Sequence, residues 1–398
     1  MWPIFHQMSK RGLLVSIPKL TELLVNVQSQ MAGQLAVIDA IAGRRINPSS
    51  GDEVAEWMAS VGLDGKRTKV TKRIATDERS LSGHDHPVLK AVVEYRGLRK
   101  LETTFIEPTI QLAERSDSII HPRWRLTKVK SGRVACEDPN LLAFPSRDEM
   151  GKKVRECFVA RPGYRLLSCD FSQLEPRIVA ALSKDKKLLE IFRAGRDLYT
   201  EVATDLGVSR QVAKIVTLGV LYGMGGRRLF EQLILAGCGT TASPTYDEEA
   251  CENLIRNWFN TYTGVKALVR VTVAEARKQG GWASTDGGRG RFLPALFIEG
   301  RGWPAGKLRE EAERQAFNHL IQGTATERMK HAMLRVDGLA EVYPLLMIHD
   351  ELVCEAPADS AEDCAATVAA LMVEKFQGVT LKTTHVVGDT WGSLKGQA

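Results

Sequence analysis

The sequence lacks apolar runs of membrane-spanning length, and its cysteines lack metal-binding spacing. No stretch of 18 consecutive apolar residues occurs, and the first 20 residues, which include Pro3, His6 and Pro18, contain no uninterrupted apolar segment. We therefore expect neither a membrane span nor a secretion signal. The seven cysteines include no CxxC pair, which argues against a zinc site and a disulfide framework and favours a reducing, intracellular setting.

Length and charge narrow the class of protein without identifying it. A chain of 398 residues exceeds the size at which a single core stops growing, so we expect several parts with clefts between them. With 44% hydrophobic and 26% charged residues, the chain has the composition of a globular protein. The net charge of +6 suits a polyanionic partner, but many basic proteins bind no nucleic acid. Charge alone therefore does not identify the partner.

Hydrophobic periodicity predicts a mixture of helices and short strands. Apolar positions from Ile17 to Ala42 recur at helical spacing and predict one long amphipathic helix, closed by Gly43. The segment 165–169 is predicted to be a short buried strand, and 344–348 and 352–355 a hairpin. Helices are predicted over most of 185–280, with breaks at the glycine pairs 225–226 and 280–281, and over about 309–339 and 361–376, with a last strand at 380–387.

A basic stretch lies between the early helical segments. It places five cations in eight residues, and its members are Lys66, Arg67, Lys69, Lys72 and Arg73. Such a stretch is either a solvated loop or a contact for nucleic-acid phosphates, and the pattern does not decide between them.

Two acidic residues stand where rigid backbone can present them to a cleft. Asp170 ends the predicted strand in LLSCDFSQLEPR, and Asp350 lies at the predicted hairpin turn in LLMIHDELVCE. Phosphoryl transfer to a hydroxyl group uses two divalent cations about 4 Å apart, so carboxylates must converge on one point. Either residue alone is no more than an acid at a strand end. Together they predict a metal-dependent phosphoryl-transfer site.

The segment between these acids carries cations on one helix face. Ser209 is a suitable N-cap, and Arg210, Lys214, Leu218 and Tyr222 recur every four residues, so they share one broad face. This face suits a triphosphate held by the first turns and a base pair near the aromatic at the end. The alternative is an amphipathic helix with a solvated basic edge.

These segments resemble a known enzyme family in order and spacing. DFSQLEPR (170–177), RQVAKIVTLGVLYG (210–223) and IHDEL (348–352) are similar to the three motifs of bacterial DNA polymerase I and its phage relatives, which form DNA polymerase family A. Three more segments resemble the family, namely SGRVACEDPNLLAFP (131–145), ERQAFNHLIQGTATE (313–327) and the thumb-like VEYRGLRKLETTFI (93–106). The resemblance covers nearly the whole chain.

The resemblance implies a fold and an activity. The fold class is α+β, a right hand with a thumb at 1–125, a palm with an antiparallel sheet at 126–185 and 310–398, and helical fingers at 186–309. The activity is template-directed, DNA-dependent addition of dNTPs to a primer 3′ end by a nucleotidyltransferase in DNA replication and repair. The implied cofactor is Mg²⁺, as two ions, with Mn²⁺ as a substitute. Because the first residues already resemble the thumb, we expect no proofreading exonuclease within this chain.

The resemblance also assigns roles to individual residues. Asp170 and Asp350 match the metal-binding aspartates and Glu351 the supporting acid, while Lys214 matches a triphosphate contact that is also a candidate proton donor to pyrophosphate. The implied nucleotide contacts are Arg210, Lys214, Leu218, Tyr222, Glu175, Gln173 and His349, with Glu175 closing over the sugar 2′ position. The implied DNA contacts are Arg133, Asn140, Arg314, Asn318 and Gln322. For His349, a packed palm histidine is the alternative.

The sequence also departs from the family pattern. Leu218 stands where the family usually has Phe or Tyr, Pro176 replaces an aliphatic residue, and Leu142 and Ala143 replace a polar pair. These departures favour a phage or prophage relative, acting as a monomer in the cytoplasm, at the nucleoid or in an infected bacterial cell. Primer-template DNA, dNTPs, replication accessory proteins and a separate or upstream exonuclease are the implied partners.

Two rival functions remain at the level of sequence. A non-catalytic DNA-binding module with this fold would not need Asp170, Asp350 and Lys214. An enzyme that uses an RNA template or ribonucleotides is disfavoured by Glu175 and by the QGTATE segment, 322–327.

Overall fold

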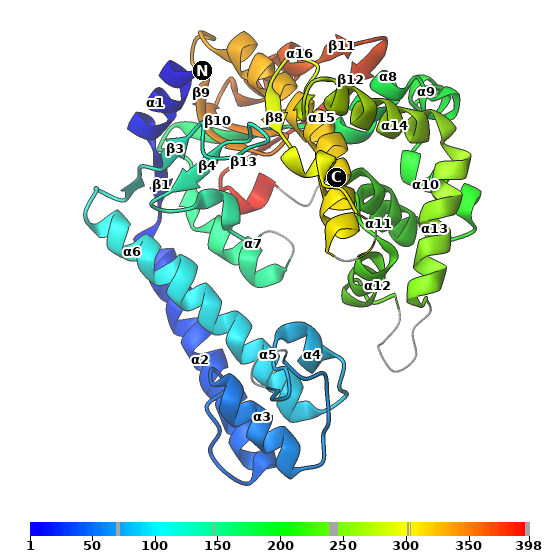
Figure 1. Ribbon diagram of the computed structural model, residues 1–398. Coiled ribbons are helices and arrows are strands. Elements are labelled where there is room, and N and C mark those ends of the chain that lie inside the picture. Colours follow the sequence, from blue (N-terminus) through cyan, green and yellow to red (C-terminus); the bar gives the residue numbers. More distant parts are fainter. Residues whose placement is uncertain (69–71, 146–147, 239–245, 301, 303, 395–398) are drawn as a thin grey trace.

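The computed structural model describes residues 1–394 except 69–71, 146–147, 239–245, 301 and 303. Figure 1 shows a small sheet and its covering helices in the centre, a long helical arm on one side and a second helical group on the other. This arrangement confirms the predicted α+β class with antiparallel sheets. Within the described residues, none of the helices combines the length and the apolar character needed to span a bilayer.

The central sheet has four antiparallel strands in the order β13-β6-β10-β9. Their bounds are β6 (Tyr164–Phe171), β9 (Tyr343–Ile348), β10 (Glu351–Pro357) and β13 (Thr383–Gly388). Four consecutive β6 residues, 166–169, are buried, because both faces of this inner strand are covered. The register places Asp170 of β6 opposite Glu351 of β10 and Thr384 of β13.

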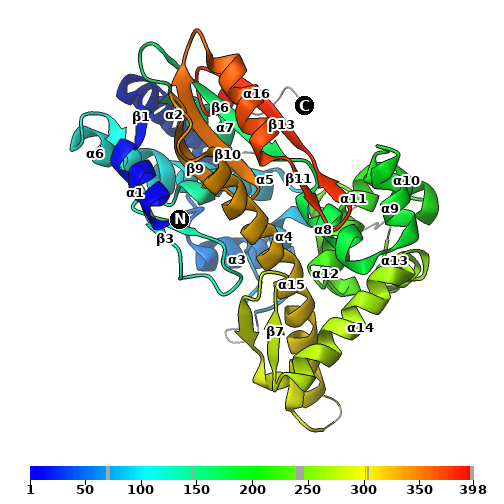
Figure 2. The same cartoon turned by 90° about the horizontal axis from the view of Figure 1, so that it is seen from above.

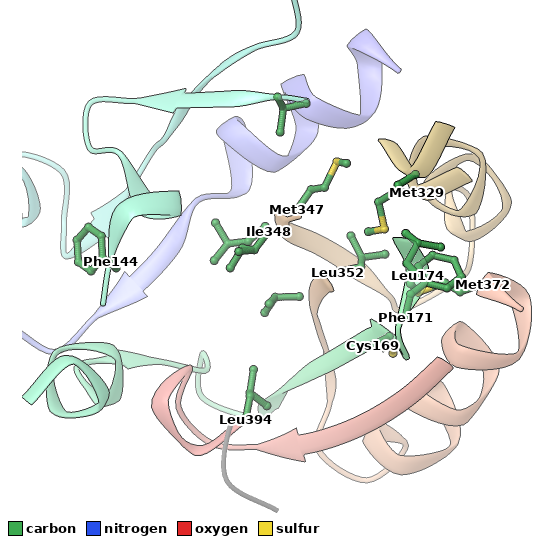
Figure 3. Packing of buried hydrophobic residues seen from close by; sticks show 14 of the residues in the cluster. Phe144, Cys169, Phe171, Leu174, Met329, Met347, Ile348, Leu352, Met372 and Leu394 are labelled. Atoms are coloured by element: carbon green, nitrogen blue, oxygen red, sulfur yellow. The ribbon is translucent and has the colours of Figure 1, made fainter. Parts of the chain in front are cut away.

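Three helices cover the sheet. They are α8 (Leu174–Ser183), α15 (Ala305–Val336) and α16 (Ala361–Met372), and α16 packs on β6 and β13. In the close view of this core, Cys169 and Phe171 of β6 lie among Leu352, Leu174, Met329 and Met372 (Figure 3). The apolar residues of the motifs thus form the floor on which the acidic residues stand.

The helical arm comprises residues from α2 to α6. Its elements are α2 (Ile17–Ala42), α3 (Gly51–Ser60), α4 (Glu78–Ser82), α5 (Pro87–Lys100), the π-helical turn η1 (Leu101–Ile106) and α6 (Glu107–Glu114). The tip has a separate core that includes Ile38, Trp57 and Leu89. The predicted helix 17–42 is confirmed, and Gly43 closes it in the left-handed conformation that suits glycine.

The basic stretch lies at the tip of this arm. Arg73 pairs with Asp52, and Arg67 donates to Asp64 and to the carbonyl oxygen of Lys72. Lys69 lies outside the described residues, and the choice between a solvated loop and a phosphate contact stays open.

The second helical group supports α11. Its members are α9 (Lys186–Arg193), α10 (Leu198–Leu206), α11 (Arg210–Leu221), α12 (Gly226–Leu235), α13 (Glu248–Thr261) and α14 (Thr263–Lys278). The apolar face of α11, including Val212, Val216 and Val220, is buried. The indole of Trp258 on α13 donates to the Thr217 hydroxyl at 3.3 Å, which fixes the rotation of α11 about its axis. Seen from above, this group lies to one side of α15 (Figure 2).

Short elements complete the chain. They are α1 (Trp2–Arg11), β1 (Leu13–Val15), β2 (Ile119–Ile120), β3 (Arg123–Arg125), β4 (Ala135–Glu137), η2 (Leu141–Ala143), α7 (Glu149–Glu156), β5 (Phe158–Val159), β7 (Trp282–Ser284), β8 (Gly290–Phe292), η3 (Pro294–Phe297), β11 (Glu374–Phe376), β12 (Val379–Leu381) and η4 (Gly392–Leu394). Helix α1 packs on β9 and β3, and β1 joins β2 and β5 in a small sheet.

The C-terminal prediction was partly wrong. The helix ends at Met372 rather than at residue 376, and the predicted strand 380–387 is two strands, β12 and β13. The reason is a hairpin between β11 and β12, whose turn residues Gln377 and Gly378 both have positive φ. Two such residues match the twist of a tight hairpin. The Gln-Gly pair between short apolar runs was a usable signal.

A buried carboxylate attaches α1 to the sheet. Glu355 of β10 is fully buried and accepts hydrogen bonds from Arg11 at 2.6 Å and from Arg161 at 2.8 Å, while the Arg161 backbone N–H donates to its other oxygen. The Arg11 guanidinium also lies 3.6 Å from the centroid of the Tyr343 ring. This cluster joins three separate parts of the chain.

We predict that Glu355→Ala lowers the free energy of unfolding by about 3 kcal/mol, because the change leaves two guanidinium groups without their buried counter-ion. Chemical denaturation followed by circular dichroism measures the effect. The control is Glu362→Ala, since Glu362 is exposed and only 3.8 Å from Arg165. Equal loss of stability in both variants would contradict the structural role of the cluster.

Candidate active site

Backbone pairing brings the two predicted catalytic acids together. Asp170 lies near the end of β6, and Asp350 lies in the two-residue turn between β9 and β10. The N–H of Phe171 donates to the carbonyl oxygen of Asp350 at 3.1 Å, so this turn lies directly beside β6. His349, the other turn residue, has a left-handed φ of 59°. It is exposed, so the alternative of a packed histidine is wrong.

The direction of the Asp170 side chain follows from the alternation of the strand. Cys169 donates to the carbonyl oxygen of Ala365 on α16, so its side chain faces that helix. Successive side chains point to opposite faces of a sheet, which directs Asp170 away from α16. Ser168 shares the face of Asp170 and donates to Glu351 at 2.6 Å. Glu351 is therefore a buried neighbour of Asp170, anchored by a hydroxyl group.

The donor set of these acids suits a hard cation. Mg²⁺ prefers oxygen ligands, keeps several waters, and is commonly bound by one or two carboxylates together with substrate phosphates. Asp170 and Asp350 supply two carboxylates and no nitrogen or sulfur donor. In the part of the chain that the structure describes, no group of three or more His, Cys, Asp and Glu side chains could hold a metal ion by itself. The residues fit a site completed by phosphates.

Glu175 connects three separate motifs. It lies in the first turn of α8, accepts a hydrogen bond from Arg133 at 2.8 Å, and interacts by hydrogen bond with the Tyr222 hydroxyl. Burial raises the pKa of the Glu175 carboxyl, whereas Arg133 and Tyr222 oppose that rise. Burial, together with the charge of Glu175, raises the pKa of Tyr222 to about 12. Gln173, at the N-cap of α8, is half-buried and left-handed.

Helix α11 presents the predicted cations to solvent. Ser209 is its N-cap and accepts from the Val212 N–H, as predicted. Arg210 and Lys214 are exposed, Leu218 is half-buried, and Tyr222 follows at the C-cap. Both cationic groups lie within 6 Å of the centroid of the Tyr199 ring, at 5.7 and 5.8 Å, which confirms that they share a face.

Helix α15 carries the remaining predicted contacts. Arg314, Asn318 and Gln322 are spaced by four residues, and Arg314 lies so close to Gly223 that a Cβ there would be 2.9 Å from the arginine Cβ. Gly223 also has a φ of 68°, so glycine is required next to Tyr222. Asn140 lies in the exposed segment before η2. The contacts described above do not include Asn140, Asn318 or Gln322.

Sequence reasoning missed two residues of α10 and its N-cap. Tyr199 is buried beneath Arg210 and Lys214, and its pKa is raised to about 12 by burial, with further contributions from the carboxylates of Asp197, Glu175 and Asp350. Asp197 pairs with Arg210. An aspartate before a helical run signals an N-cap, but no local pattern indicates that it pairs with another helix.

Comparisons with known proteins agree with this geometry. The model of DNA polymerase family A matches residues 17–393. The chain is 33% identical over 409 residues to a thermostable DNA polymerase I of Thermus filiformis, covering 98% of this chain and 47% of the relative. It is 31% identical to DNA polymerase I of Deinococcus radiodurans, covering 98% of this chain and 41% of that protein. The chain thus spans about half the length of these curated relatives.

A solved structure shares the fold over nearly the whole chain. The POL domain of Pol1 from M. smegmatis, in complex with a DNA primer-template and dNTP, superposes with a TM-score of 0.87 at 28% identity. The match covers 99% of this chain and 70% of the other. Together with the family model, it leads to one conclusion: this chain belongs to DNA polymerase family A.

Proposed function

We propose that this chain catalyses template-directed addition of deoxynucleotides to the 3′ end of a DNA primer. The observation that carries the proposal is the position of Tyr199. Its ring lies beside Arg210 and Lys214, and its hydroxyl is close enough to Asp350 and Glu175 for their charges to raise its pKa. The cations of α11 and the carboxylates of the sheet therefore surround one space, which suits a nucleotide triphosphate near a metal-dependent centre.

Asp170 and Asp350 are proposed to hold two Mg²⁺ ions, for which Mn²⁺ is a substitute. Such ions, when bound, lower the pKa of the attacking hydroxyl group and neutralise charge on the triphosphate. The chain contributes rigidity, because a strand end and a two-residue turn fix both carboxylates. Glu351, held by Ser168, supports this arrangement from within the sheet.

Arg210 and Lys214 are proposed to contact the triphosphate. Two cations one helical turn apart match its extended negative charge, and their attraction strengthens as charge develops on the leaving pyrophosphate. Lys214 carries an ammonium group able to protonate that leaving group. Leu218, one turn further along α11, would lie toward the sugar.

Glu175 is proposed to exclude ribonucleotides by occupying space at the sugar 2′ position. Arg133 and Tyr222 hold its carboxylate in place. Arg133 would also face the nascent base pair, with Gln173 and His349 on the nucleotide side of the site. Asn140, Arg314, Asn318 and Gln322 would contact DNA.

In this proposal, the chain forms a thumb at 1–125, a palm at 126–185 and 310–398, and fingers at 186–309. The arm from α2 to α6 is the main body of the thumb, whereas α1 lies against the palm sheet. The primer-template would bind between thumb and fingers, as the DNA-bound M. smegmatis domain with the same fold suggests.

We predict that Asp170→Asn and Asp350→Asn each reduce the rate of primer extension to below about 1% of the parent rate, because both carboxylates are needed for the metal pair. Duplex affinity should change little, since phosphate contacts dominate it. A gel assay with Mg²⁺ measures the rate, and fluorescence anisotropy measures the affinity. Asp359→Asn, in the exposed turn after the far end of β10, is the control. Substantial extension by either variant would remove the two-metal assignment.

We predict that Glu175→Ala increases incorporation of ribonucleotides relative to deoxynucleotides, because truncation opens space at the 2′ position. Single-turnover incorporation of matched dNTP and rNTP gives the ratio. Glu190→Ala on α9 is the control, since Glu190 is exposed and pairs only with Arg196 among the ion pairs that involve it in the described chain. An unchanged ratio would show that another residue provides the selectivity.

Leu218 gives a prediction that departs from the family pattern. A tyrosine at this position supplies a hydroxyl where a dideoxynucleotide lacks its 3′-OH, and leucine does not. We expect the parent to discriminate against dideoxynucleotides, Leu218→Tyr to relax this discrimination by about 5- to 150-fold, and Leu218→Phe not to relax it. The ratio of incorporation efficiencies for ddNTP and dNTP decides. Equal relaxation by both variants would mean that aromatic packing, not the hydroxyl, is responsible.

A further inference from the structure

The guanidinium group of Arg210 is paired with a carboxylate of its own chain. Its Nε lies 3.0 Å from Asp197 Oδ1, and its Nη2 lies 3.0 Å from Asp197 Oδ2. Two parallel N–H···O bonds of this kind are the strongest arrangement for an arginine and a carboxylate. Asp197 therefore uses one complete edge of the group that is proposed to contact the triphosphate.

Asp197 is fixed from its own side as well. It is the N-cap of α10, and its Oδ1 accepts from the N–H and the hydroxyl of Thr200, both at 2.8 Å. Hydrogen bonding from Arg210 is the main cause that lowers the pKa of Asp197, to about 2, so the carboxylate is ionised at neutral pH. The negative charge is thus permanent and cannot swing away from the mouth of the site.

The pair is accessible to an incoming anion. The side chain of Arg210 is 59% exposed and that of Asp197 is 35% exposed. An exposed ion pair contributes little net stability and exchanges easily, because water solvates both partners when they separate. A triphosphate offers several oxygens to the same N–H donors, so it can replace Asp197 without leaving a buried charge behind.

The neighbouring residues place this exchange inside the proposed nucleotide site. Tyr199, two residues after Asp197, lies beneath both Arg210 and Lys214. Lys214 has no carboxylate partner among the ion pairs of the described residues. Of the two cations, only Arg210 is held, so the two would differ in their readiness to bind phosphate.

We propose that Asp197 is a positioning residue that holds Arg210 in the nucleotide-free fingers and releases it to the triphosphate, thereby weakening the affinity for nucleotide. The inference rests on the proposed function, since it assumes that Arg210 binds a triphosphate. A fixed negative charge beside a bound polyanion lowers affinity even where no bond is exchanged. Asp197 would thus set the nucleotide concentration at which the fingers fill.

Asp197→Asn separates the charge of Asp197 from its structural role. Asparagine caps a helix as well as aspartate does, so α10 should keep its N-terminus, and Asp197→Ser provides a second variant with a capping side chain. The control is Glu201→Gln, which removes one negative charge from the same helix, where Glu201 pairs with Arg196 instead.

The test is binding of dGTP, with Mg²⁺, to the protein on a template whose primer ends in a dideoxynucleotide, measured by titration calorimetry. We expect Asp197→Asn to lower the Kd for dGTP by about three- to tenfold. Glu201→Gln should leave it unchanged within a factor of about two. In an Arg210→Ala background the effect of Asp197→Asn should disappear, because the two residues act as one unit.

The outcomes are distinguishable. An unchanged or raised Kd in Asp197→Asn and Asp197→Ser would overturn the inference and make Asp197 a support for bound Arg210. The same tightening in Glu201→Gln would reduce the effect to general charge and overturn it too. If the parent complex bound no dGTP, the proposed function would fail, and the inference would fail with it.

Discussion

The antiparallel pairing of β6 with β10 is the constraint on which the site depends. It sets Asp170 opposite Glu351 and, through the bond from the Phe171 N–H to the Asp350 carbonyl, places the β9–β10 turn beside the end of β6. A slip of one residue would send Asp170 toward α16 and replace it with an apolar side chain, because side chains alternate along a strand. The buried residues 166–169 oppose such a slip, since it would expose apolar surface.

Three arginine–carboxylate contacts perform different tasks according to their burial. Glu355 is fully buried between Arg11 and Arg161 and joins α1 to the sheet. Glu175 is mostly buried and is shared by Arg133 and Tyr222, so it fixes the relation of the palm to the end of α11. Asp197 and Arg210 are exposed and can exchange partners. The same chemistry therefore gives stability in the interior and a replaceable contact at the mouth of the site.

Family membership and this geometry support each other without being equivalent. The match over 17–393 and the similar fold of the M. smegmatis domain establish the family. Leu218 differs from the aromatic residue typical of the family, and its half-buried place on α11 gives that difference a physical consequence at the sugar. Such positions are where this chain would differ from its relatives in selectivity rather than in reaction.

The sequence by itself determined features that depend on neighbours along the chain. The helix 17–42, the strand before Asp170, the hairpin around Asp350 and the Ser209 cap all follow from periodicity, capping and turn chemistry, which act over a few residues. The Gln377-Gly378 hairpin was also local, but its signal went unrecognised.

Only the tertiary structure decided which distant groups meet. The contacts of Glu175 with Arg133 and Tyr222, of Glu355 with Arg11, and of Asp197 with Arg210 join separate elements. A carboxylate has the same local pattern whether it caps a helix, faces solvent or pairs with a guanidinium from another helix. Its partner is set by how the helices and the sheet pack, and that packing depends on the burial of the whole core.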